Sequence, residues 1–485
     1  MSSSDSGLKA DTYGWDTAFG IRVTDVNASI KRKKTSPKSF EGTTKDPNTN
    51  HLITVTGDFS DWKITQGGSG KLIHMETPVT GFTAKGKGRN GDELTFTYGP
   101  GRFVIEVELE YVPHTDPPKD GSGTFHNLKV KHTADGGQKE VTVMGGYGFG
   151  TSTSDPKTPY SAIQDDVEAA MQNWFNAHLI DFEHVFATVN LNRTADKGQF
   201  AWLLPTYTSY AYIDHDTLDD SILGILCMTE NRSADGLVQE ISPNVIPKGS
   251  RAGFLIAPHR FVQDMVLPSM PLVYKGVSTD DFALKTDKAG LSLANGPITI
   301  PDLKDKSNGK SYKAELKNFE LSTSDGALTI DATTRVTVSP HIWAFTQHIA
   351  SYDLALHTTK EGKQTIFYKA KGKPTSNHWT EHDATISDLT IWEAIIAALI
   401  TILVGILTGG AGFAIAALIT GILVGIASKI PGMIEAANTD DSPAIDLLAF
   451  NAVDPLQWSD QKDFNLDQVS LNYSVQMGGT PKFGE

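Results

Sequence analysis

The sequence predicts an α+β protein in which antiparallel strands dominate and one apolar helical element is inserted late in the chain. Three observations support this fold class. Alternating apolar and polar residues recur along most of the 485 residues, and 44 glycines and 23 prolines punctuate them. One amphipathic helix is expected soon after residue 158, and one long uncharged stretch lies around residue 400. We find neither an internal repeat nor a coiled-coil pattern.

Composition limits the function classes. The net charge is −15, which argues against a general nucleic-acid-binding protein, because phosphate contacts need Lys and Arg. Cys227 is the only cysteine, so the fold cannot depend on an intramolecular disulfide. Residues 1–11 form a polar tail that we expect to be disordered, and they lack the apolar segment of a secretory signal. We therefore expect cytoplasmic synthesis and, if the protein acts outside the cell, release without a classical signal peptide.

The first elements are short. Thr24 is suited to cap a helix that carries Val26 and Ile30 on one face and ends in the basic run 31–34. From residue 51 to residue 146 the pattern predicts strands and turns. The clearest strand is Phe103–Tyr111, in which apolar residues alternate with glutamates, as in a half-buried antiparallel strand.

An amphipathic helix is predicted over Tyr160–Leu179. Pro159 suits the first position of a helix, and apolar residues then recur at helical spacing. Asp165, Glu168 and Gln172 are expected to face away from this apolar side. A broad apolar face is more typical of a core helix than of a cofactor site, although a core helix can also line a cavity. The candidate ligand-binding residues are Ile163, Val167, Met171 and Trp174.

The longest apolar segment has no charged residue between Glu393 and Lys429. Two arms, 391–407 and 413–430, flank the sequence Thr408-Gly-Gly-Ala-Gly412. Glycine costs about 1 kcal/mol in a helix interior, so this segment is expected to break the helix. The sequence therefore predicts an apolar helical hairpin at 391–436, inserted between a body at 12–390 and a strand segment at 437–485 that completes it.

Two environments for the hairpin remain open, because a helix that is apolar all round must be buried in protein or in lipid. The arms are at the short end of the length of a membrane span, and the flanking residues are mostly acidic. Both features disfavour permanent insertion. If the hairpin of 391–433 does contact a membrane, the candidate membrane-interacting residues are Trp392, Ile395, Leu399, Leu403, Phe413, Leu418 and Leu423.

One motif has the residue types of a metal site. His378-Trp-Thr-Glu-His382 matches the inverted zincin pattern, which requires a helix so that both imidazoles reach one metal ion. Neither flank of the motif has a helical pattern. We therefore expect no metal and no cofactor, and we see neither a nucleophile elbow nor a catalytic pair of carboxylates. The chain is not expected to be an enzyme.

A family resemblance lies in the opening Thr12-Tyr-Gly-Trp-Asp-Thr-Ala-Phe-Gly-Ile21, in 250–257 and in Phe464–Val475. These segments resemble the single-body accessory proteins of OrfX-type clostridial neurotoxin gene clusters, which belong to the tubular lipid-binding (TULIP) superfamily. The resemblance implies a long, strongly curved antiparallel sheet wrapped around a helix, which here is the helix at 160–179. Related TULIP proteins hold lipid in an apolar channel. The resemblance assigns no ligand-binding residue.

The function that these observations favour is non-catalytic binding of lipid or another hydrophobic molecule by an accessory protein of a toxin system. The expected partners are therefore a lipid or hydrophobic small molecule, with a membrane and other toxin-cluster proteins as further candidates. Two alternatives remain open. One is a membrane-inserting toxin component that uses the 391–433 hairpin, and the other is a protein–protein scaffold.

Overall fold

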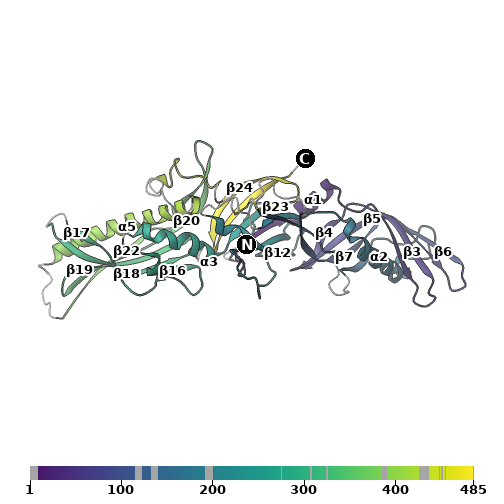
Figure 1. Ribbon diagram of the computed structural model, residues 1–485, viewed down its shortest axis with the longest axis horizontal. Helices are drawn as coiled ribbons and strands as arrows, with labels where there is room; N and C mark the ends of the chain where they lie inside the picture. The colour runs from purple at the N-terminus through teal and green to yellow at the C-terminus, as the bar shows by residue number, and fades with distance from the viewer. Residues whose placement is uncertain are drawn as a thin grey trace, which may run out of the picture.

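Strands dominate the described part of the chain and lie in four antiparallel sheets that follow one another along an elongated molecule (Figure 1). The computed structural model describes residues 9–114, 123–132, 140–191, 200–274, 276–305, 309–323, 326–384, 390, 392–424, 436–446, 448, 452–453 and 455–483. Within its longest helix, the side chains of 404–414, 418 and 421–424 lie outside this description. We call the seven-stranded sheet with its helix the N-terminal module and the eight-stranded sheet with its helix the C-terminal module.

The N-terminal module forms the right-hand part of Figure 1. Its strands run in the order β10-β7-β5-β3-β2, with β4 and β6 also paired to β5. The helix α2 (Gln164–His178) lies on the inner face, between the short turns η1 (Tyr160–Ala162) and η2 (Leu179–Asp181). The strands are β2 (Ser39–Lys45), β3 (Leu52–Phe59), β4 (Lys63–Ser69), β5 (Leu72–Lys87), β6 (Glu93–Tyr98), β7 (Gly101–Val107) and β10 (Val141–Tyr147).

The predicted strand Phe103–Tyr111 is divided in the structure. Its first part is β7, and its second part is β8 (Leu109–Pro113), which belongs to a different sheet. The alternation of buried residues continues through the break, so the sequence pattern could not reveal it. The second sheet has the order β23-β11-β9-β8, with β9 (Thr124–Val130), β11 (Ala187–Leu191) and β23 (Leu456–Trp458).

The middle of the molecule is a six-stranded sheet with the order β12-β13-β1-β14-β25-β24. Its strand β13 is buried along its whole length, which explains its continuous apolar sequence. The predicted strand Phe464–Val475 ends earlier than expected, because the chain turns at Tyr473 and returns as a second strand. The strands are β1 (Thr17–Arg22), β12 (Pro205–Ile213), β13 (Ile222–Thr229), β14 (Ala252–Ile256), β24 (Gln461–Asn472) and β25 (Ser474–Phe483).

Short helices connect the sheets. The predicted basic-ended helix is α1 (Val23–Lys33), with Val26 and Ile30 buried. Its expected cap is wrong, since Arg22 occupies the capping position and the Thr24 hydroxyl instead donates to Asp219. The remaining short helical segments are η3 (Ala201–Leu203), α3 (Pro258–Phe261), η4 (Val262–Val266), η5 (Leu267–Ser269), α4 (Met270–Val273) and η6 (Thr279–Asp281).

The C-terminal module forms the left-hand part of Figure 1. Its sheet has the order β15-β16-β18-β19-β20-β21, with β17 paired to β18 and β22 paired to β20. The longest strand, β20, has β19 on one side and both β21 and β22 on the other. The strands are β15 (Phe282–Leu284), β16 (Gly290–Leu293), β17 (Ile298–Lys304), β18 (Ser311–Ser322), β19 (Leu328–Ser339), β20 (Ile342–Thr358), β21 (Gln364–Ala370) and β22 (Thr375–His382).

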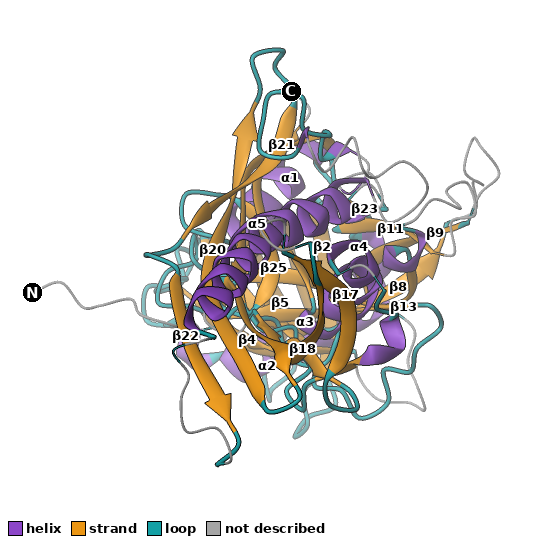
Figure 2. Cartoon of the chain, turned by 90° about the vertical axis from the view of Figure 1, so that its left-hand side faces the viewer, coloured by secondary structure: helices purple, strands orange, loops and turns teal. Residues whose placement is uncertain are grey.

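The predicted apolar hairpin is wrong. The structure has one helix, α5 (Glu393–Val424), which continues through the glycine-rich segment 408–412. It lies against β19, β20, β21 and β22 along the curved sheet (Figure 2). Glycine costs about 1 kcal/mol per residue in a helix, whereas each buried Leu or Ile contributes about 1.5–3 kcal/mol. Burial of residues such as Leu399, Leu403 and Ile415 therefore outweighs the cost of the glycines.

One side of α5 is buried against the rest of the protein. Ile396, Leu399 and Leu403 belong to the same apolar core as the sheet, and Ala416 and Ala417 pack beside α4. The part of the predicted second arm beyond residue 424 lies outside the described residues. Counting only residues that the structure describes, no helix reaches the length and hydropathy of a membrane span.

Candidate functional site

The helix α2 is tied to both edges of the sheet that curves around it. The Glu168 carboxylate accepts a hydrogen bond from the Gly146 amide at 2.8 Å, and Gln172 exchanges hydrogen bonds with the backbone of β10. On the opposite side, the Asn173 amide donates to the Thr43 carbonyl of β2 at 2.9 Å. Glu168 and Gln172, expected to face away from the apolar side of the helix, therefore contact the edge strand β10. They satisfy the backbone of an edge strand, which would otherwise be open to solvent.

The apolar side of α2 faces the core, as predicted. Val167 and Met171 are fully buried, and Trp174 is 6% exposed. Trp174 packs against Phe59 with ring centroids 5.2 Å apart and stacks on His178 at 5.0 Å. Met171 and Trp174 therefore contribute mainly to the packing of the module.

An open space lies between the start of α2 and the strands that face it. We call this space the distal mouth. It is a hollow of about 230 Å³ at the end of the module where the β2–β3 and β5–β6 turns lie. The predicted residues Ile163 and Val167 form its helix side, and the strands contribute the apolar side chains of Ile53, Ala84, Leu94 and Phe96.

Gly86 keeps the distal mouth open. It lies in β5 between Ile53 of β3 and Leu94 of β6, on the inner face of the sheet. A Cβ atom at this position would have only ordinary contacts, the nearest being an Ile53 side-chain atom at 3.5 Å. The backbone therefore tolerates a side chain here, and the absence of one widens the mouth.

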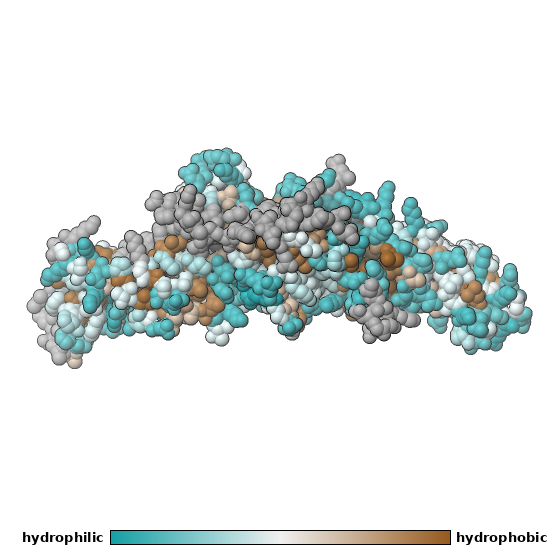
Figure 3. All heavy atoms as spheres, viewed as in Figure 1, coloured by the Kyte–Doolittle hydropathy of each residue, from teal (hydrophilic) through white to brown (hydrophobic). Residues whose placement is uncertain are grey.

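The rim of the distal mouth carries both charges and exposed apolar side chains. Lys85, Lys87 and Arg89 supply positive charge, and Asp166 supplies negative charge. The pKa of Asp166 is raised, first by burial and then by the neighbouring Asp46 and Asp165. Leu94, the second residue of β6, lines the mouth and is 37% exposed. Leu52, which begins β3 next to the lining residue Ile53, is 57% exposed. Apolar side chains also surface near the right-hand end of the molecule in Figure 3.

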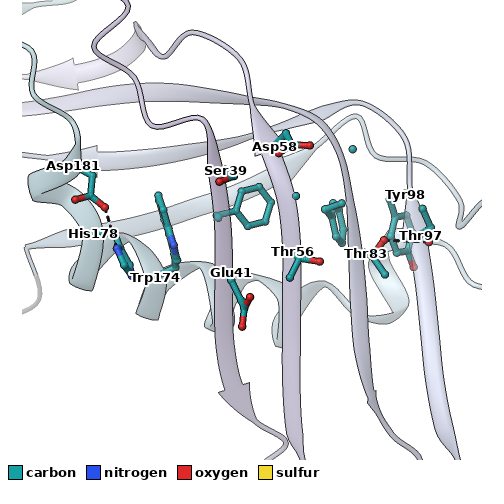
Figure 4. A pocket seen from close by; sticks show the side chains of 14 residues that line it. Ser39, Glu41, Thr56, Asp58, Thr83, Thr97, Tyr98, Trp174, His178 and Asp181 are labelled. Atoms are coloured by element: carbon teal, nitrogen blue, oxygen red, sulfur yellow. Dashed lines mark hydrogen bonds and ion pairs between the residues drawn. The ribbon is translucent and has the colours of Figure 1, made fainter.

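A second hollow, of about 730 Å³, lies beside the other end of α2 (Figure 4). Its walls are polar, with hydroxyl groups from β2, β3, β5 and β6 and the carboxylates of Glu41, Asp58 and Asp181. His178 Nδ1 and the Asp181 carboxylate form a hydrogen bond at 3.0 Å, and the His178 ring stacks on Trp174. The aromatic side chains beneath this hollow, including Phe82 and Tyr98, are almost completely buried. It therefore offers little apolar surface to a ligand.

The candidate membrane-interacting residues divide into three groups. Leu399 and Leu403 are fully buried beneath the C-terminal sheet. Trp392 and Ile395 are half-buried and pack against the same core. The side chains of Phe413, Leu418 and Leu423 lie outside the described residues. The first group could contact a membrane only if α5 left the sheet.

The His378–His382 motif lies on the strand β22. Residues four apart on a strand are separated by about 13 Å, because each residue advances the chain by about 3.3 Å. In the described part of the chain, no group of three metal-binding side chains comes together. We retain the expectation that neither histidine binds zinc, and elemental analysis of the purified protein would test it.

The comparisons with known proteins address this whole architecture. The OrfX-like family model, described as Protein OrfX2/OrfX3/P47, matches residues 12–479. The chain belongs to this family. It is 31% identical over 491 residues to Protein OrfX3 of Paraclostridium bifermentans, which covers 97% of this chain and 98% of that protein. It is 29% identical over 501 residues to Protein OrfX3 of Clostridium botulinum strain Kyoto / Type A2, with 98% and 99% coverage.

Solved structures show the same fold in this OrfX-like family. P47 from Clostridium botulinum A2 superimposes with a TM-score of 0.60 at 17% identity, over 97% of this chain and 98% of that one. P47 of Clostridium botulinum E1 gives 0.57 at 16% identity, over 97% and 100%. The resemblance seen in the opening Thr12–Ile21 is thus confirmed, and the chain is a member of the accessory-protein family of botulinum-type toxin clusters.

Sequence reasoning missed two features of the region around α2. One is Gly86, whose lack of a side chain leaves space between neighbouring strands. The other is that Glu168 and Gln172, which are expected only to face away from the apolar side, bond the backbone of β10, as Asn176 also does. A repeat of carboxylate and amide side chains at four-residue spacing, next to an apolar face, was the available signal.

Proposed function

We propose that this OrfX-like protein is a non-catalytic accessory protein that binds an apolar ligand, such as a lipid chain, at the distal mouth of the N-terminal module. The observation that carries the proposal is the opening between the start of α2 and the inner sheet face, lined by Ile163, Val167 and Phe96. Ligand sites of this kind are mostly apolar clefts with a few polar groups at the rim. The mouth has this composition, although its volume of about 230 Å³ suits one chain or a small molecule.

The proposal takes its ligand class from the chemistry of the mouth. Burial of an apolar ligand contributes about 25 cal/mol of binding free energy for each Å² of its surface that leaves water. The apolar side chains inside the mouth can cover such a surface. The basic side chains of Lys85, Lys87 and Arg89 lie where a polar or anionic end of the ligand would emerge. Binding of an apolar ligand is compatible with membership of a family of toxin-cluster accessory proteins. The partners that we propose are a hydrophobic molecule and, beyond it, a membrane or other proteins of the cluster.

The test fills the mouth without disturbing its backbone. Gly86→Leu would place an apolar side chain between Ile53 and Leu94, and Gly99→Leu is the matched control at a position with open space around it. Native mass spectrometry with lipid extraction, followed by titration with a fluorescent fatty acid, measures binding. We expect Gly86→Leu to weaken binding about tenfold or more, equal to about 1.4 kcal/mol, and Gly99→Leu to leave it unchanged. Equal binding by both variants would exclude the mouth as the site.

A further inference from the structure

A third hollow lies at the centre of the molecule, and the residues that line it are distant in the sequence from those of the distal mouth. It measures about 720 Å³, within the usual range of small-molecule sites. Five separate segments meet there, represented by Tyr13, Arg232, His259, Lys288 and Tyr473. We call it the central hollow. The Tyr-Gly-Trp-Asp opening, which carries the family resemblance, forms one of its walls.

The backbone around the central hollow is unusual. Tyr13, Lys288 and Tyr473 line it with φ values of 52°, 56° and 69°, in the left-handed region that bulky residues rarely adopt. Glu230 and Asn231, at 52° and 57°, form the turn that carries Arg232 into the hollow. Such conformations concentrate at functional sites, where the surrounding structure holds them in place.

At one end of the central hollow, the guanidinium group of Arg232 is held in place by Asp16. The buried Asp16 accepts hydrogen bonds from the Thr229 amide at 2.9 Å, the Thr229 hydroxyl at 3.0 Å and His259 Nε2 at 3.0 Å. Burial alone would raise the pKa of Asp16, but the bonds from His259 and Thr229 and the nearby arginines lower it. The carboxylate therefore stays ionised and holds Arg232 Nε at 3.6 Å. Because Asp16 already accepts three bonds, the partly exposed Arg232 keeps donors for a ligand.

The other end presents carboxylates beside an aromatic ring. Asp11 and Asp287 line the hollow together with Tyr473. The pKa of Tyr473 is raised by burial and then by these two acids. The Lys9 ammonium lies 4.8 Å from the centre of the Tyr473 ring. The Tyr473 ring therefore already faces a primary ammonium group, which the chain itself supplies. The lining thus holds Asp11 and Asp287 as well as Arg232 and Lys288, so it offers partners for both charges of a zwitterion.

We propose that the central hollow binds a small zwitterion that carries an ammonium group and a phosphate or carboxylate group. The anionic group would pair with Arg232 and Lys288, and the ammonium group would lie over the Tyr473 ring in place of Lys9, near Asp11 and Asp287. Charged hydrogen bonds of this kind are among the stronger ones in proteins. The site is independent of the apolar ligand proposed for the distal mouth.

Calorimetry with phosphoethanolamine tests this proposal on the full-length protein. We expect binding that Arg232→Gln and Asp287→Asn each weaken about tenfold or more, while Arg89→Gln, at the distal mouth, leaves it unchanged. Lys288→Gln provides a second variant at an exposed position, should Arg232→Gln fail to fold. The absence of heat up to about 10 mM phosphoethanolamine, or equal binding by all variants, would overturn the proposal.

The same chemistry could come from a free solute or from a lipid headgroup. Sedimentation with vesicles of phosphatidylethanolamine distinguishes these sources. Binding to vesicles that Arg232→Gln and Lys288→Gln both reduce would identify a headgroup as the ligand. Binding of the free compound without binding to vesicles would identify a soluble zwitterion. Either result supports the site. If the free compound does not bind, and both variants bind vesicles as well as the unmodified protein does, the proposal is contradicted.

Discussion

The two modules place a helix against a curved sheet by different physical means. In the N-terminal module, α2 is amphipathic, and side chains such as Gln172 and Asn173 bond both edges of the sheet. In the C-terminal module, α5 has only Glu393 as a charged residue and is held through buried side chains such as Leu399 and Leu403. Directional hydrogen bonds select one rotation of α2, whereas α5 is apolar on every side and relies on the packing of its side chains for its orientation. This difference suits α2 to hold an open mouth beside it.

The largest expected effect tests the burial of α5. Leu403→Asp removes a fully buried side chain and introduces an unpaired charge, which together should cost more than about 5 kcal/mol of unfolding free energy. Ala397→Asp, on the exposed side of the same helix, is the control and should change stability by about 0.5 kcal/mol. Denaturant unfolding measures both. If Leu403→Asp kept full stability but abolished liposome binding, α5 would be a membrane element instead.

The next effect tests the aromatic packing of α2. Trp174→Ala should lower the unfolding free energy by about 3–5 kcal/mol, because Trp174 is nearly buried among Phe40, Phe59 and Phe175. The matched change in the other module is Trp392→Ala, which should cost less because Trp392 is half-buried. Thermal unfolding ranks the two variants. A Trp174→Ala protein with unchanged stability and reduced ligand uptake would place this residue in a channel.

Acid should weaken the N-terminal module through His184. Burial and the nearby Lys33 lower the pKa of this histidine to about 3, so it stays neutral when folded. Its unfolded pKa is about 6.5, and the stability it contributes is therefore lost as pH falls from 6.5 towards 3. At pH 5 the loss is about 2 kcal/mol, from about 1.4 kcal/mol per pKa unit.

The variant His184→Phe tests whether His184 causes this loss of stability in acid. Phe182 and Phe186 already contact the ring, so a phenyl group fits the surroundings. We expect the dependence of the melting temperature on pH to flatten between pH 6.5 and pH 5, whatever the change at neutral pH. His382→Gln, at an exposed position of β22, should keep the original slope. An unchanged slope in His184→Phe would assign the acid sensitivity to other groups.

The smallest effect tests the polar attachment of α2. Gln172→Ala leaves backbone groups of β10 without their side-chain partner and should cost about 1–2 kcal/mol. Asn173→Ala removes one bond at an exposed position and should cost about 0.5 kcal/mol. Hydrogen exchange at Val143 would report the loss locally. Protection unchanged at Val143 in Gln172→Ala would mean that packing alone positions the helix.

The sequence alone predicted the elements whose residues repeat with a regular period. The helix after Pro159, the burial of Val167 and Met171 and the abundance of alternating strands are all confirmed by the structure. These features depend on local periodicity, which each segment carries by itself. The family resemblance added the expectation of a sheet wrapped around a helix.

Only the tertiary structure decided the features that depend on a neighbour. The glycines at 408–412 favour a break, but burial against β19–β22 stabilises a continuous helix. The strand from Phe103 changes sheets after Val107 because its partners change, while its alternation does not. The sequence around Asp16 does not reveal its partners, because the fold brings Thr229, His259 and Arg232 to it from distant segments. A local pattern specifies which side of an element is apolar, whereas the partner that covers that side is set by contacts between residues distant in the chain.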